Sequence, residues 1–89
     1  MATILLVDDE LNILTVLNTL LKAEGYDVLT ARDAEKAHEF VRTKAIDLLI
    51  TDIRMTPING IELLKWVRAE RPEISVIMLT AFFEYMLTP

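Results

Sequence analysis

The stretch Thr3-Ile4-Leu5-Leu6-Val7-Asp8-Asp9 places a continuous apolar run directly before two acidic residues. A short run of this kind is typical of a β-strand that is covered on both faces. Asp9 is suited to cap a following helix, because a carboxylate accepts the unpaired N–H groups of a first turn. Apolar residues then recur at helical spacing until Gly25, which provides the stop. The apolar residues of this predicted helix are Ile13, Leu14, Leu17, Leu20 and Leu21.

Strands and helices continue to alternate along the chain. Three more strands are predicted, over residues 27–31, 47–51 and 75–79. A helix capped by Asp33 separates the first two, and a helix from about Ile61 to Pro72 separates the last two. This order predicts an α/β fold, a parallel sheet with helices on both faces. The residues predicted to face inward are Ala34, Ala37, Phe40 and Val41 in the first of these helices, and Ile61, Leu64 and Val67 in the second.

Length and composition narrow the class of protein. The 89 residues fit one small domain over residues 1–89. A net charge of −5 opposes direct binding to nucleic acid, and the absence of cysteine excludes thiolate metal sites and disulfides. No apolar run approaches the roughly 18 residues that span a bilayer, so we expect a cytoplasmic domain without a membrane segment. The single histidine, His38, is predicted to be a solvated surface residue.

Acidic residues follow two of the predicted strands. Asp8 and Asp9 come after the first strand, and Asp52 comes directly after the third. Functional groups gather at the carboxyl ends of parallel strands, so the three carboxylates converge if these strands are neighbours. Like charges that close raise one another's pKa values, and Mg²⁺ with its preference for oxygen ligands would relieve the repulsion. The alternative is that Asp9 is only a helix cap and Asp52 only the first residue of a loop.

Four stretches spread along the chain carry a resemblance to a known family. They are residues 4–10 (Ile-Leu-Leu-Val-Asp-Asp-Glu), 47–55 (Asp-Leu-Leu-Ile-Thr-Asp-Ile-Arg-Met), 59–64 (Asn-Gly-Ile-Glu-Leu-Leu) and 76–81 (Val-Ile-Met-Leu-Thr-Ala). In this order and spacing the chain resembles a response-regulator receiver domain of two-component signalling. The resemblance implies a flavodoxin-like, doubly wound parallel sheet, the receiver fold, here truncated and without the usual fourth and fifth helices.

The resemblance also assigns roles to the acidic residues. Asp52 corresponds to the phosphoacceptor, Asp9 to the direct Mg²⁺ ligand, and Asp8 to the acid that holds the metal through water. Arg54 stands where the family uses a backbone carbonyl as a metal ligand. These residue types suit the chemistry, because a carboxylate is a competent nucleophile toward a phosphohistidine, and Mg²⁺ cancels charge as the phosphoryl group passes between donor and acceptor.

Residues 80–89 agree with the family only in part, so the resemblance implies an incomplete receiver-type domain with an atypical tail. Thr80 matches the hydroxyl residue that bonds the phosphoryl group, and Ala81 leaves room beside it. Thr88 stands where the family has a phosphate-pairing lysine. Two interpretations follow: a receiver domain that accepts a phosphoryl group on Asp52 with Mg²⁺, or a degenerate or truncated receiver that acts as an interaction or dimerisation module without phosphotransfer.

The resemblance implies partners as well as chemistry. The phosphoryl donor would be a sensor histidine kinase or a phosphotransfer protein of a phosphorelay. The domain would not be an enzyme beyond slow self-catalysed phosphotransfer and dephosphorylation. An uncovered sheet face predicts a homodimer, because exposed apolar patches usually become interfaces. A phosphatase with an aspartyl nucleophile is disfavoured, because such enzymes carry Asp-x-Asp after the first strand and this chain has Asp8-Asp9 there.

Overall fold

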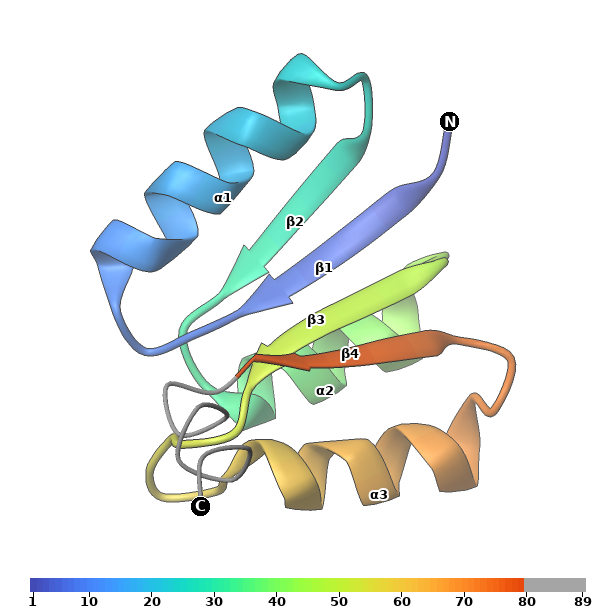
Figure 1. Ribbon diagram of the computed structural model, residues 1–89. Helices are drawn as coiled ribbons and strands as arrows, with labels where there is room; N and C mark the ends of the chain where they lie inside the picture. Colours follow the sequence, from blue (N-terminus) through green and yellow to red (C-terminus); the bar gives the residue numbers. More distant parts are fainter. Residues whose placement is uncertain (80–89) are drawn as a thin grey trace, which may run out of the picture.

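The computed structural model describes residues 1–79, which form a four-stranded parallel sheet with three helices (Figure 1). The strand order β2-β1-β3-β4 confirms the predicted α/β fold and makes β1 and β3 neighbours. The predictions for the tail of residues 80–89 lie outside the described residues. The elements are β1 (Thr3–Val7), α1 (Leu11–Ala23), β2 (Asp27–Ala31), α2 (Ala34–Thr43), β3 (Leu48–Asp52), α3 (Gly60–Glu70) and β4 (Ser75–Leu79).

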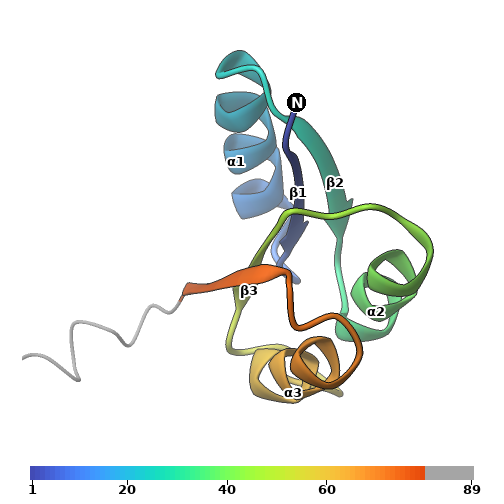
Figure 2. The same cartoon turned by 90° about the vertical axis from the view of Figure 1, so that its right-hand side faces the viewer.

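Helices cover the two faces of the sheet unequally. α1 lies on one face, and α2 and α3 lie on the other (Figures 1 and 2). Successive side chains of a strand point to opposite faces, so β1 supplies both sides of the core. Its residues Leu5 and Val7 join the larger cluster with α2 and α3, whereas Ile4 and Leu6 join a smaller cluster with Leu14 of α1. The strand β1 is therefore buried between two apolar layers, as its continuous apolar run predicted.

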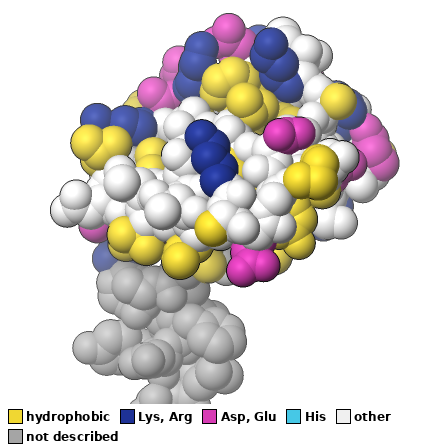
Figure 3. Space-filling model, turned by 90° about the horizontal axis from the view of Figure 1, so that it is seen from above, with side chains coloured by type: hydrophobic (Ala, Val, Ile, Leu, Met, Phe, Trp, Pro, Cys, Tyr) yellow, Lys and Arg dark blue, Asp and Glu magenta, His cyan; other side chains and the backbone are white. Residues whose placement is uncertain are grey.

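The helix α1 buries less of its apolar stripe than predicted. Leu14 is buried, but Ile13 and Leu20 are 41% and 57% exposed. The face of the sheet that carries α1 is also open at β4, where Ile77 is 47% exposed. Seen from above, hydrophobic side chains are interspersed with basic and acidic ones (Figure 3). Within residues 1–79, no helix is both long and apolar enough to cross a membrane.

The helix α2 agrees with its prediction, but α3 agrees with its prediction only in part. The Asp33 side chain caps α2 by accepting a hydrogen bond from the Lys36 N–H at 2.7 Å. In α3 the prediction that Val67 faces the core is confirmed, whereas Ile61 is 40% exposed and Leu64 is only half-buried. The helix turns Gly60 and Leu63 into the core beside Val67. The inner face is shifted because Gly60 packs against the backbone at the end of β3.

His38 is not the solvated residue that was predicted. Its side chain is only 20% exposed, and its ring stacks on Trp66 with ring centroids 4.5 Å apart. Its Nε2 also contacts the Glu70 carboxylate. His38 lies on α2, whereas Trp66 and Glu70 lie on α3, so the histidine joins the two helices that cover one face of the sheet.

Candidate metal and phosphoacceptor site

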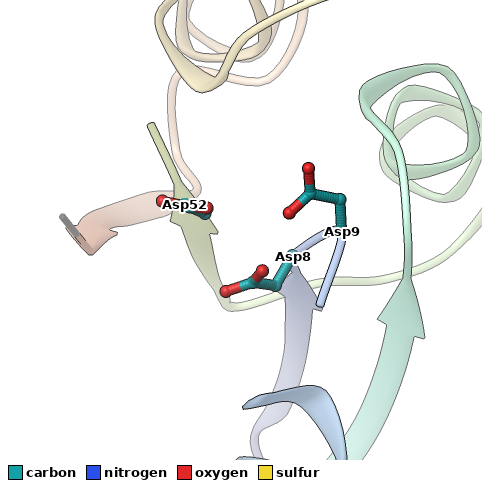
Figure 4. Close-up of side chains that lie close together, drawn as sticks. All are labelled: Asp8, Asp9 and Asp52. Atoms are coloured by element: carbon teal, nitrogen blue, oxygen red, sulfur yellow. The ribbon is translucent and has the colours of Figure 1, made fainter. Parts of the chain in front are cut away.

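Three carboxylates meet at the carboxyl end of the sheet. Asp8 and Asp9 follow β1, and Asp52 is the last residue of β3. Pairing of Val7 with Thr51 in the β1–β3 register places these acids beside one another. One carboxylate oxygen from each of the three residues lies within 4.8 Å of the others, and Figure 4 shows them grouped at the strand ends. The structure thus brings together the acidic residues that the sequence indicated.

The three carboxylates differ in their exposure to water. Asp8 is only 6% exposed, Asp52 is half-buried and Asp9 is exposed. Burial raises the pKa of Asp8, and the negative charges of Asp52, Asp9 and Glu10 raise it further. The Glu10 N–H opposes this shift in pKa by donating a hydrogen bond to Asp8 Oδ1 at 2.9 Å. A divalent cation with oxygen ligands would offset both the burial and the repulsion.

Asp9 does not cap α1, so the alternative interpretation that it is only a helix cap is wrong. The helix begins at Leu11, its N-cap position is Glu10, and no side chain makes a capping hydrogen bond there. The carboxylate of Asp9 is instead grouped with those of Asp8 and Asp52. A helix-capping role therefore gives no account of an acidic residue at this position.

The loop after β3 holds the backbone next to Asp52. The Arg54 N–H donates to Asp52 Oδ1 at 3.3 Å. Met55 is 5% exposed and belongs to the larger core cluster, so the loop is packed onto the domain. Arg54, whose carbonyl is a predicted metal ligand, therefore lies in a loop fixed at both of its sides. Thr80 and Ala81, the predicted phosphoryl-contacting residues, lie outside the described residues.

Arg32 is a residue of this sheet edge that the sequence reasoning missed. It follows the last residue of β2, and its Nη2 donates a hydrogen bond to the backbone carbonyl of Asp9 at 3.2 Å. Both residues line a cleft of about 400 Å³ that also includes Thr56 and Pro57. The signal was present in the sequence, since β2 also ends at the carboxyl edge where functional groups gather.

The fold and site together define a doubly wound α/β protein with an acidic cluster where the strand order reverses. In a comparison with protein families, the model described as "Response regulator receiver domain" matches residues 4–88 of this chain. The chain therefore belongs to the response regulator receiver domain family of two-component phosphorelay signalling, as the sequence resemblance predicted.

Curated relatives are transcriptional regulatory proteins much longer than this chain. ZraR from Klebsiella oxytoca is 43% identical over 79 residues, which are 89% of this chain and 18% of that protein. PhoP from Bacillus subtilis, named for alkaline phosphatase synthesis, is 41% identical over 78 residues, which are 88% of this chain and 32% of that protein. The chain thus spans less than a third of the length of either relative.

Solved structures agree with the family. The response regulator TrrA from Thermotoga maritima, crystallised in complex with Mg²⁺-BeF, has a TM-score of 0.90 and 38% identity, over 99% of this chain and 76% of that one. TrrA in complex with the histidine kinase ThkA has a TM-score of 0.88 and 39% identity, over 96% of this chain and 73% of that one. At these identities the likeness extends from the fold to the family.

Proposed function

We propose that this receiver domain accepts a phosphoryl group on Asp52 in the presence of Mg²⁺. The observation that carries the proposal is the grouping of the Asp8, Asp9 and Asp52 carboxylates within 4.8 Å. Three like charges that close are costly unless a cation is bound among them. TrrA, a relative of known structure, was crystallised with Mg²⁺-BeF, which supports the same metal here.

Each carboxylate has a separate role in this proposal. Asp9 would bind the metal directly, Asp8 would hold it through water, and Asp52 and the backbone carbonyl of Arg54 would complete the protein ligands. The burial of Asp8 suits a group that stays in place, and the exposure of Asp9 suits one that meets a hydrated ion. When bound, Mg²⁺ supplies positive charge that balances the phosphoryl oxygens.

The proposed reaction is a single group transfer. A carboxylate oxygen of Asp52 forms a bond to phosphorus while the bond from phosphorus to the donor nitrogen of a phosphohistidine breaks. The electron pair of the broken bond stays on the imidazole nitrogen, and the product is an aspartyl phosphate. Thr80 and Ala81 are proposed to contact the transferred group. The domain is thus a phosphoacceptor that takes part in its own phosphorylation and slow dephosphorylation, rather than a turnover enzyme.

The proposed donor is a sensor histidine kinase or a phosphotransfer protein. The complex of TrrA with the histidine kinase ThkA supports this class of partner. Residues 1–89 act as one receiver-type unit in the proposal, and the net charge of −5 disfavours direct contact with nucleic acid. A homodimer through the apolar side chains exposed at α1 and β4 remains a prediction that light scattering tests.

The experiment is an intact mass measurement before and after incubation with Mg²⁺ and acetyl phosphate. We expect one phosphoryl adduct on the wild-type protein and none on Asp52→Asn. Asp27→Asn makes the same chemical change at the start of β2. Because Asp27 lies at the amino-terminal end of its strand and the site lies at the carboxyl ends, this variant should keep the adduct. A folded wild-type protein that binds Mg²⁺ but takes up no phosphoryl group would overturn the proposal in favour of an interaction module.

A further inference from the structure

We propose that Gly60 is a positioning residue for the phosphoacceptor: the missing side chain lets the first turn of α3 rest against the main chain of Asp52 and so fixes where its carboxylate points. The inference rests on the proposed function of Asp52 and concerns how the carboxylate is held. Thr51 is the second part of the same arrangement. The two residues contact the main chain of Asp52 from α3 and from within β3.

The contact at Gly60 leaves no room for a side chain. A Cβ at this position would lie 2.2 Å from the carbonyl oxygen of Asp52 and 3.1 Å from both its carbonyl carbon and the Cα of Ile53. Among residues 1–79 only Gly25 is a glycine with positive φ, so the backbone conformation of Gly60 is open to other residues. The close approach to Asp52, and not the backbone angles, is therefore what requires glycine here.

Hydrogen bonds fix the same segment. The Gly60 N–H donates to the Ile53 carbonyl at 2.9 Å, and the Thr51 hydroxyl donates to the Asp52 carbonyl at 3.0 Å. Thr51 is fully buried, so its hydroxyl has no access to water and its hydrogen bond to the Asp52 carbonyl satisfies the donor. The carbonyl of Asp52 is thus restrained by a donor in β3 and by the surface of α3.

This restraint matters because the carboxylates of the site repel one another. Without a cation, the charges of Asp8 and Asp9 favour movement of the Asp52 carboxylate away from them. A main chain held by Gly60 and Thr51 resists that movement and keeps the three groups together before the metal binds. Sites of this kind depend on positions held within about 0.5 Å by the surrounding residues. We therefore expect Gly60 and Thr51 to set the affinity for Mg²⁺ without touching it.

The test compares variants that differ in one contact each. Gly60→Ala forces α3 and Asp52 apart, and Thr51→Val removes the hydroxyl with little change of shape, whereas Thr51→Ser keeps it. Val67→Ala is the control for lost stability, because Val67 is buried on the same helix but packs in the core away from the site. Calorimetry gives the dissociation constant for Mg²⁺, and intact mass gives the rate of phosphoryl uptake from acetyl phosphate, both measured where each variant is folded.

We expect Gly60→Ala to weaken Mg²⁺ binding by about tenfold or more, as changes in the residues that orient metal ligands commonly do. Thr51→Val should weaken it to a smaller extent, and Thr51→Ser and Val67→Ala should stay close to wild type. Wild-type affinity in both Gly60→Ala and Thr51→Val would overturn the inference, and so would an equal loss in Val67→Ala. If Gly60→Ala does not fold, the Thr51→Val and Thr51→Ser pair decides by the same criterion.

A crystal structure of Gly60→Ala separates this inference from the proposed function. The added Cβ must move at least about 1.2 Å further from the Asp52 carbonyl oxygen to reach an ordinary contact distance, so Asp52 should shift relative to Asp8. If the wild-type protein bound no Mg²⁺, the proposed function would fail, and a shifted Asp52 would still support the positioning role. An unmoved Asp52 carboxylate would overturn that role whatever the metal does.

Discussion

Replacing Asp52 with Asn is expected to stabilise the fold when Mg²⁺ is absent and to reduce the stabilisation that Mg²⁺ provides. Asn has nearly the shape of Asp and keeps the Oδ1 atom that accepts the Arg54 N–H. The substitution therefore removes one negative charge from a group of three and leaves the packing unchanged. The sign of the effect follows from the repulsion among the carboxylates at the strand ends.

The magnitude follows from the distances in the site. Two unit charges 4.8 Å apart repel by about 1 kcal/mol in water and by about 3.5 kcal/mol at an effective dielectric constant near 20. The pair of Asp52 with buried Asp8 lies toward the upper value. The pair with exposed Asp9 lies toward the lower value, because water and salt screen it. Allowing for relaxation of the side chains, we expect the free energy of unfolding to rise by about 2 kcal/mol.

The assay is urea unfolding near neutral pH, in EDTA and in excess Mg²⁺. A metal concentration 100 times the dissociation constant should stabilise the wild-type protein by about 2.7 kcal/mol and Asp52→Asn by much less. Asp27→Asn is the matched control, since it removes a carboxylate charge at the amino-terminal end of a strand, away from the site, and should show neither effect. The reasoning is refuted if Asp52→Asn gains no stability in EDTA, or if Mg²⁺ stabilises it as much as the wild type.

Three further outcomes are expected. The pKa of Asp8 is raised above 3.8 in the fold, chiefly by burial. In the absence of metal, the free energy of unfolding should therefore fall as pH rises from about 4 through that raised value. Urea titrations at several pH values should show that Asp8→Asn removes this fall. A pH dependence of stability that is the same in Asp8→Asn and wild type would contradict the prediction. His38→Ala should cost about 1 kcal/mol and alter Trp66 fluorescence, whereas an unaltered spectrum would argue against the ring stack. Asp33→Ala should cost about 1 kcal/mol in urea unfolding through loss of the α2 cap, clearly more than Glu35→Ala in the same helix turn.

Much of the fold could be predicted because strong local signals agree with it. The apolar runs at β1 and β3 mark buried strands, and Asp33 marks the start of α2. Convergence of the acids followed from one general property, that parallel strands end at the same edge of a sheet. It also needed β1 and β3 to be neighbours, which the structure confirms.

The errors arose where tertiary contacts decide between local alternatives. The α3 sequence contains two overlapping apolar stripes, one through Ile61 and Leu64 and one through Leu63, and periodicity alone does not choose between them. The packing of Gly60 on Asp52 makes the choice. His38 was placed in solvent for a similar reason, since its partner Glu70 is 32 positions away in the chain.

The pairing of β1 with β3 also has a kinetic consequence. Asp9 and Asp52 are far apart in the sequence, and they meet only after a long loop has closed and a non-local strand pair has formed. A partly folded chain in which β3 is not docked offers a metal ion only the adjacent acids after β1. Divalent cations should therefore bind the native state selectively and act mainly by slowing its opening, so that occupancy of the site prolongs the lifetime of the folded domain.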